Sequence, residues 1–315
     1  MNTNLEPGTW NREPSVPGSV HLVEVAPRDG LQNEVAALTT ADKVAFVNRL
    51  AAAGHRTIEI SAFVNPRRVP QMADASEVFA GITRVPGVRY TALVPNLAGL
   101  ARARAARVDE VAIFAAASET FSARNIGRTI AESLVIYRAV CDEARAEGVP
   151  VRGYLSTCFG CPFEGIVTAG QVAEVAACLV DLGVYEVALS DTIGVAHPAQ
   201  VQEVLAAVTR RVPVTQLALH MHDTRGTALV NVYAGLQAGV TTFDASAGGL
   251  GGCPFAPGAT GNLVTEDLIY MLDGLGVVTG VRLDGIVEAS RAIEPLVGHP
   301  LPSRVFCSTQ AAIRS

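Results

Sequence analysis

The chain has 315 residues, of which 49% are hydrophobic and 17% are charged, and its net charge at pH 7 is −6. This composition is typical of a folded domain with a large core, and the lack of a basic patch argues against nucleic acid as a partner. The sequence has no apolar run of about 18 residues that would span a membrane and no signal peptide at its start. Its six cysteines are too few for a disulfide scaffold. We therefore expect a cytoplasmic protein without a membrane partner.

Short apolar runs rich in β-branched residues alternate with longer alanine-rich stretches. Before them, residues 1–20 contain three prolines and two glycines and predict a loosely ordered arm. The apolar runs predict eight strands, at residues 21–27, 57–63, 89–95, 110–116, 149–157, 185–191, 216–223 and 241–247. Apolar residues at helical spacing predict helices between them, at residues 40–53, 129–147, 168–182 and 198–209. Residues 264–294 predict an eighth helix and an extra helix, followed by a polar tail.

Eight strand–helix units over roughly 250 residues predict an α/β fold, a (β/α)8 TIM barrel with an extra C-terminal helix. We expect a flexible N-terminal arm at 1–20, a catalytic barrel with its C-terminal helical extension at 21–295, and a C-terminal tail at 296–315. A doubly wound open sheet is the alternative. The early segment PRDGLQNE (27–34) lacks the phosphate-binding glycine pattern that such a sheet usually carries.

Functional residues of a barrel lie where its strands end and the following loops begin. Polar residues that an apolar strand has no reason to carry stand in or directly after the predicted strands. They are Arg28, Asp29, Glu59, Arg152, Asp191, His220 and His222.

Residues 219–226 read LHMHDTRG, with two histidines separated by one residue. Side chains two apart on a strand share a face, so His220 and His222 project together and predict a metal site. Asp29 follows the first strand, close to the seventh in a closed barrel, and adds an oxygen ligand. Nitrogen and oxygen ligands without thiolates favour Mg²⁺, Mn²⁺, Co²⁺ or Zn²⁺ with open water positions over a structural zinc centre. The alternatives are a helix-capping histidine and a surface turn at Asp29–Gly30.

The segment GGLGGCPFAPGATGN (248–262) contains six glycines and predicts a mobile lid after the last strand. Cys253 at its centre is interpreted as a thiol that acts as an acid, a base or a nucleophile, with simple packing as the alternative. Asn262 either caps the next helix or offers its carbonyl oxygen to the metal. Cys158 and Cys161 form a C-x-x-C pair that we interpret as structural, because no second pair completes a zinc site.

Taken together, these motifs resemble the metal-dependent hydroxymethylglutaryl-CoA lyases. The resemblance extends over about residues 21–295. It is carried by VEVAPRDGLQNE (23–34), SAFVNPRRVPQM (61–72), AASETFSARNI (116–126), VRGYLSTCFGCPFEG (151–165), LSDTIGVA (189–196), HMHDTRG (220–226) and GGLGGCPFAPGATGNLVTEDLIYML (248–272). The cysteine-containing glycine segment is the most specific of these, because related aldolases and synthases share the R-D and H-x-H motifs but not, as a rule, this segment.

The resemblance implies cleavage of 3-hydroxy-3-methylglutaryl-CoA to acetyl-CoA and acetoacetate, a step of leucine catabolism. A divalent cation, Mg²⁺ or Mn²⁺, would be held by Asp29, His220, His222 and Asn262. Arg28 would stabilise the enolate oxygen, Cys253 would be the lid thiol, and Glu59 and Asp191 would support the site. The expected catalytic residues are therefore Arg28, Asp29, Glu59, Asp191 and Cys253. The expected contacts to the acyl-CoA substrate are Arg28, Gln32, Ser118 and Arg152, and relatives suggest a homodimer.

Two residues depart from the pattern of these lyases. Arg225 stands where an uncharged or aromatic residue is common, and Val35 lies near where some relatives carry a lysine for the CoA phosphates. The acyl group therefore stays open, because lyases for citramalyl-CoA or for a longer 3-alkylglutaryl-CoA share this catalytic core. A metal-dependent 4-hydroxy-2-oxo-acid aldolase is a further alternative. A non-catalytic binding barrel is disfavoured, because it has no need for Arg28, Asp29 and Cys253 together.

Overall fold

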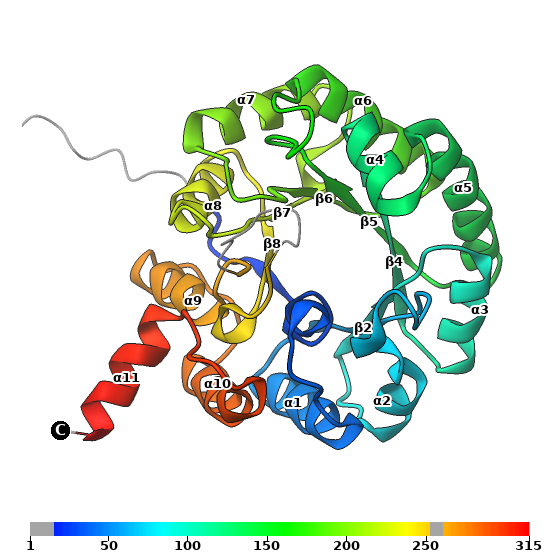
Figure 1. Cartoon of the computed structure of the whole chain (residues 1–315). Helices are drawn as coiled ribbons and strands as arrows, with labels where there is room; N and C mark the ends of the chain where they lie inside the picture. The colour runs from blue at the N-terminus through cyan, green and yellow to red at the C-terminus, as the bar shows by residue number, and fades with distance from the viewer. Residues whose placement is uncertain (1–15, 253–260, 315) are drawn as a thin grey trace, which may run out of the picture.

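The computed structural model describes residues 16–252 and 261–314. In this part of the chain, eight parallel strands close into a barrel in chain order, and the last strand pairs with the first (Figure 1). The strands are β1 His21–Glu24, β2 Thr57–Ala62, β3 Arg89–Leu93, β4 Glu110–Ala116, β5 Val151–Ser156, β6 Val187–Ser190, β7 Leu217–His220 and β8 Thr242–Ala245. The predicted TIM barrel is confirmed, and each strand lies within its predicted range.

Helices surround the barrel on its outer side (Figure 1). They are α1 Thr40–Ala52, α2 Ala75–Gly81, α3 Leu97–Ala105, α4 Glu119–Ile126, α5 Ile130–Ala146, α6 Ala169–Leu182, α7 Pro198–Val208, α8 Ala228–Gln237, α9 Thr265–Gly274, α10 Leu283–Val297 and α11 Arg304–Arg314. Five short helical turns lie in the loops of the described chain: η1 Ala26–Gly30, η2 Leu31–Asn33, η3 Pro70–Met72, η4 Val214–Gln216 and η5 Ala247–Gly249.

Local residues determine where several of these helices begin and end. At the start of α1, the Thr39 side chain accepts a hydrogen bond from the Asp42 N–H, and the Asp42 carboxylate accepts one from the Thr39 N–H. Thr168 and Gln171 make the same reciprocal pair at the start of α6. Each pair satisfies N–H groups that have no partner within the helix. Gly183 ends α6 in the left-handed conformation, with φ at 96°, which a glycine adopts without strain.

A buried ion-pair network links strands on different sides of the barrel. Nε of Arg152 on β5 lies 2.7 Å from Oε1 of Glu186, and Nη2 of Arg152 lies 2.8 Å from Oδ1 of Asp244 on β8. Burial alone would raise the pKa of Asp244, but Arg152 and His220 together outweigh burial and lower it. Buried charges of this kind are tolerated because each has a partner.

The predicted tail at 296–315 contains a helix that the sequence did not predict, α11. The carboxylate of Asp267 on α9 accepts hydrogen bonds from the Ser303 hydroxyl at 3.1 Å and from the Val305 N–H at 2.9 Å. Because this cap comes from a residue far away in the sequence, the local pattern carried no signal for it. Phe306 is buried and fixes the helix to the rest of the protein.

The last residues of the predicted N-terminal arm are paired with the C-terminal part of the chain. Val278 N–H donates to the Gly18 carbonyl, and the Val20 N–H donates to the Val278 carbonyl, both at 3.0 Å. Gly18 and Val20 of the predicted arm are therefore held by backbone hydrogen bonds, and residues 1–15 lie outside the described part. Within the described residues, no helix combines the length and apolar character needed to cross a membrane.

Replacing Arg152 tests whether the ion-pair network stabilises the barrel. We expect Arg152→Met to lower the free energy of unfolding by about 3 kcal/mol, because Asp244 and Glu186 would then be buried without their partner. Urea unfolding followed by circular dichroism measures this change. The control is Arg282→Met in the exposed Arg282–Asp284 pair, where we expect a change of about 0.5 kcal/mol or less. Equal stabilities of the two variants would contradict the structural role of Arg152.

Candidate metal centre

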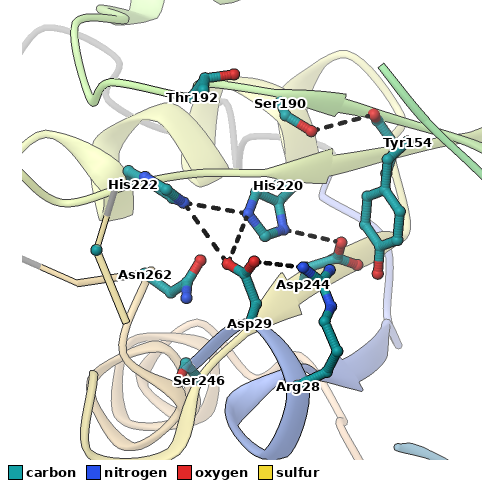
Figure 2. Close-up of polar contacts among 12 residues, drawn as sticks. Arg28, Asp29, Tyr154, Ser190, Thr192, His220, His222, Asp244, Ser246 and Asn262 are labelled. Carbon is teal, nitrogen blue, oxygen red and sulfur yellow. Dashed lines mark hydrogen bonds and ion pairs between the residues drawn. The ribbon is translucent and has the colours of Figure 1, made fainter. Parts of the chain in front are cut away.

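A tight backbone turn presents Arg28 and Asp29 directly after the first strand. In η1, the N–H groups of Arg28, Asp29 and Gly30 all donate to the carbonyl of Val25, at 3.1, 2.8 and 3.2 Å. The turn follows the carboxyl end of β1, where barrel sites form. It brings Asp29 opposite His220 and His222, as Figure 2 shows.

Both histidines of the H-x-H pair point into the same site. His220 is the last residue of β7, whereas His222 lies just beyond the strand, in an isolated bridge with Asn262. The strand is thus shorter than predicted, yet the Nε2 atoms of the two rings lie only 3.2 Å apart. The bridge to Asn262 also explains how a residue 40 positions further along the chain reaches the same place.

Asp29 completes a group of three potential metal ligands. Its Oδ2 lies 3.8 Å from Nε2 of His220 and 4.0 Å from Nε2 of His222. Ligand atoms that bind one cation at about 2.1 Å stand no more than about 4.2 Å apart, so all three distances suit a shared ion. Among the described residues, this is the group of histidine, cysteine and acidic side chains close enough to hold a metal.

Asn262 provides a further oxygen at this place. Its Nδ2 donates to the Leu250 carbonyl at 3.1 Å. Its Oδ1 is buried and has no hydrogen-bond partner among the described residues. A buried polar atom without a partner is costly, and a cation would satisfy it. The residues present therefore fit a divalent ion with three or four protein ligands.

The protonation states in the site also suit a metal. Burial disfavours the charged form of Asp29, but Arg28 and the two histidines outweigh burial and lower its pKa to about 2. For His222, burial and the neighbouring His220 lower the pKa to about 4. At neutral pH, Asp29 is therefore an anion and His222 is neutral, which are the forms that coordinate a cation.

His220 is oriented by a carboxylate behind it. Nδ1 of His220 lies 3.1 Å from Oδ2 of Asp244, which leaves Nε2 directed at Asp29 and His222 (Figure 2). Such carboxylate–histidine pairs fix the ring and its tautomer in metal sites. Asp244 is in turn held by Arg152. Arg152, expected to contact substrate, is 2% exposed and is placed in this supporting network.

Arg28 is held by two carboxylates. Its guanidinium pairs with Oδ1 of Asp29 and lies 2.6 Å from Oε2 of Glu59. Burial opposes its charge, but Asp29 and Glu59 outweigh burial and raise the pKa of Arg28, so it stays protonated. The Tyr154 hydroxyl donates to the same Glu59 oxygen at 3.1 Å, and the guanidinium lies 5.3 Å from the Tyr154 ring centre. Glu59 thus contacts Arg28 rather than the proposed metal ligands.

Two other predicted residues support loops. Asp191, directly after β6, accepts hydrogen bonds from the N–H groups of Val195 and Ala196, each at 2.9 Å. Ser118 caps α4 by accepting the Phe121 N–H at 3.1 Å. Ser118 is fully buried, and like Asp191 it does not line the cavity described below. These contacts show side chains that order the loops around the site.

The C-x-x-C pair is buried and unsuited to redox exchange. Cys158 Sγ donates to the Leu155 carbonyl at 3.0 Å, and burial raises the pKa of its thiol. Cys161 Sγ lies 3.0 Å from the Ser118 hydroxyl. Because a reactive cysteine needs a stable thiolate, this environment agrees with the structural interpretation of the pair.

The two ends of the glycine segment pack directly against the site. Gly251 has a φ of +108°, and a Cβ at that position would lie 2.5 Å from Nδ2 of Asn262. A Cβ at Gly261 would lie 1.8 Å from the Gly249 carbonyl oxygen. The Asn33 side chain donates to the Gly252 carbonyl at 2.6 Å. Cys253, the predicted thiol, lies outside the described residues.

The site opens into a cavity of about 860 Å³ at the carboxyl ends of the strands. Its lining includes Arg28, Asp29, His220, His222 and the predicted substrate residue Gln32. Several residues that contribute to the site or its lining were not predicted from the sequence: Tyr154, Ser190, Thr192 and Asp244. Asp244 was detectable, because an acidic residue within the apolar run TTFDASA is the same signal that identified Glu59.

Comparisons with known proteins agree with the site. The HMGL-like family model matches residues 19–293. A hydroxymethylglutaryl-CoA lyase of Bacillus subtilis is 48% identical over 288 residues, covering 91% of this chain and 96% of that protein. A 3-hydroxy-3-isohexenylglutaryl-CoA/hydroxymethylglutaryl-CoA lyase of Pseudomonas aeruginosa is 50% identical over 290 residues, covering 92% and 97%.

The fold of this chain is also similar to that of solved hydroxymethylglutaryl-CoA lyases. The crystal structure of a hydroxymethylglutaryl-CoA lyase from Pseudomonas aeruginosa matches with a TM-score of 0.93 and 49% identity, covering 94% of this chain and 99% of that one. The resemblance found in the motifs is thereby confirmed. This chain belongs to the HMGL-like family.

Proposed function

We propose that this protein is a lyase that cleaves 3-hydroxy-3-methylglutaryl-CoA to acetyl-CoA and acetoacetate with a bound divalent cation, Mg²⁺ or Mn²⁺. The observation that carries the proposal is the convergence of Asp29, His220 and His222 beside the protonated Arg28 in one cavity. The names of the relatives, at 48 and 50% identity over nearly the whole chain, support the same activity.

The reaction breaks the bond between the carbinol carbon and the α-carbon of the thioester. Asp29, His220, His222 and Asn262 would hold the cation, which when bound acts as a Lewis acid that acidifies and orients the tertiary alcohol. Arg28 faces the cavity with a permanent positive charge. It is suited to stabilise the negative charge that develops on the thioester enolate oxygen, a contribution of about 3 kcal/mol for one such donor.

Two protons must move during the cleavage. The alcohol proton leaves as the carbonyl of acetoacetate forms, and the unprotonated groups near it are Asp29 and a histidine. The α-carbon of the released acetyl-CoA gains a proton, and the thiol of Cys253 is the proposed donor. Glu59 and Asp191 contribute indirectly, Glu59 by holding Arg28 and Asp191 by ordering the loop after β6.

A specific observation favours a second candidate for the acyl group of the substrate. The lining of the cavity includes the apolar residues Leu93, Phe114, Phe121 and Ile136. An alkyl group longer than methyl would find apolar contacts there. The Pseudomonas aeruginosa relative carries both a hydroxymethylglutaryl-CoA and an isohexenylglutaryl-CoA activity in its name. A lyase for longer 3-alkylglutaryl-CoA esters is therefore the second candidate. The homodimer, the cytoplasmic location and the role in leucine catabolism stay predictions.

A coupled assay tests the proposed reaction directly. We expect the purified protein with Mg²⁺ or Mn²⁺ to release acetyl-CoA and acetoacetate from 3-hydroxy-3-methylglutaryl-CoA. The site supplies the side chains that would bind the metal ion and the Arg28 guanidinium that would stabilise the enolate. The preference for the acyl group is measured by comparing kcat/KM for this thioester with kcat/KM for citramalyl-CoA and for 3-hydroxy-3-isohexenylglutaryl-CoA. A protein that releases acetyl-CoA from none of these thioesters would rule out the proposal.

Replacing Asn262 tests the fourth metal ligand. We expect Asn262→Ala to weaken Mn²⁺ binding about tenfold or more, since removing even an outer partner of a metal site has an effect of about this size. Isothermal titration with Mn²⁺ measures the affinity. Asn125→Ala, at an exposed residue of the same cavity lining, should bind Mn²⁺ as the wild type does. Unchanged affinity in Asn262→Ala would remove Asn262 from the ligand set.

Replacing Cys253 separates proton transfer from metal binding. We expect Cys253→Ser to lower kcat about a hundredfold or more, the size of a typical general acid contribution, while Mn²⁺ affinity is retained. Cys307→Ser serves as the control, because Cys307 is an exposed free cysteine on α11. Parallel loss of turnover and metal affinity would place the Cys253 sulfur among the metal ligands instead.

A further inference from the structure

Two charged residues besides Arg28, Asp29 and the histidines line the cavity, Arg68 and Arg128. Arg68 lies in the loop between β2 and η3, and Arg128 lies in the turn between α4 and α5. Both residues are exposed and line the same cavity as His220 and His222, which are only 6% and 5% exposed. The cavity thus extends from a buried metal centre to a rim with two arginines.

The charges of these two arginines are not neutralised by the lining. Apart from the histidines, the charged lining residues are Arg28, Asp29, Arg68 and Arg128, and Arg28 is already paired with Asp29. In the described chain, no carboxylate oxygen lies within 4 Å of the guanidinium of Arg68 or Arg128. The lining therefore carries two positive charges available to an anionic ligand.

Arg128 does influence one carboxylate at longer range. Hydrogen bonds from Thr129 lower the pKa of Glu132, and the charge of Arg128 adds to this effect. The Glu132 carboxylate is engaged in the capping box at the start of α5, where it accepts the Thr129 N–H at 2.9 Å. Glu132 thus feels the charge of Arg128 without forming an ion pair with it among the described contacts.

We propose that Arg68 and Arg128 form a phosphate-binding site that holds the diphosphate and 3′-phosphate of coenzyme A at the mouth of the cavity. The proposal rests on the proposed function, which places an acyl-CoA in this cavity. With the thioester beside Arg28 and the metal ligands, the long pantetheine arm carries the nucleotide away from the buried end. Guanidinium groups match phosphate oxygens through two parallel hydrogen bonds, so arginine is well suited to this position.

Neighbouring arginines provide matched controls. Arg67 is exposed and adjacent to Arg68 in the sequence, but it does not line the cavity. Arg124 lies near Arg128 on α4, and its guanidinium stacks 4.3 Å from the ring centre of Phe163. Removal of either control residue changes the net charge by the same amount without removing a cation from the lining. A general effect of surface charge is thereby distinguished from a local contact.

The experiment compares two thioesters that have the same acyl group and the same reacting bond. One is 3-hydroxy-3-methylglutaryl-CoA, and the other is the 3-hydroxy-3-methylglutaryl thioester of pantetheine, which has no phosphate. We expect Arg68→Ala and Arg128→Ala each to lower the ratio of the two kcat/KM values by about fivefold, the effect of one exposed charge-assisted contact. The Arg67→Ala and Arg124→Ala controls should keep the wild-type ratio.

A binding measurement keeps this test independent of turnover. We expect isothermal titration to give weaker binding of free coenzyme A in Arg68→Ala and Arg128→Ala, with no matching change for pantetheine. An unchanged ratio and unchanged coenzyme A affinity would overturn the proposal. Equal losses with both thioesters would also overturn it, because they would indicate a role in shaping the cavity. Failure of the proposed function would instead appear as a wild-type protein that cleaves neither thioester.

Discussion

The carboxylate of Asp244 couples the core of the barrel to its proposed active end. Both of its oxygens accept hydrogen bonds from the buried Arg152 guanidinium, and Oδ2 also lies 3.1 Å from Nδ1 of His220. Arg152 and His220 together keep this carboxylate ionised, and its contact with Nδ1 of His220 leaves Nε2 directed at Asp29 and His222. The direction of one metal ligand therefore depends on an ion pair that also joins β5 to β8. The contacts that join these two strands therefore also position a proposed metal ligand.

A buried carboxylate also positions Arg28, because Glu59 pairs with its guanidinium. The Tyr154 ring lies close to both buried cations, with its centre 5.3 Å from the guanidinium carbon of Arg28 and 5.0 Å from that of Arg152. Attraction of both cations to one aromatic ring adds to the carboxylate contacts. The positive charge proposed to meet the enolate is thus fixed before a ligand enters. A charge fixed in this way needs little reorganisation during the reaction, which is the main advantage of a protein site over water.

The sequence predicted those features of the fold and the site that depend on the local pattern of apolar and polar residues. The strands, the barrel and the side chains at the strand ends followed from apolar runs and from polar residues placed against them. What it could not predict depends on contacts between distant residues. The cap that Asp267 provides for α11 has no local signal. Arg152 was expected at the substrate because it is a polar residue in an apolar strand, but its partners, Glu186 and Asp244, come from other strands. A buried cation with structural partners has the same local pattern as a catalytic one.

The close packing at Gly251 and Gly261 has a consequence for how sequence variation in such proteins is interpreted. Neither position has room for a methyl group, because a neighbouring side-chain or backbone atom already fills the space. Selection would retain both glycines for steric reasons even in a descendant that had changed its chemistry. Their invariance across a set of homologues would therefore be weak support for a shared activity, whereas variation at Arg28 or Asp29 would be a far better marker of divergence.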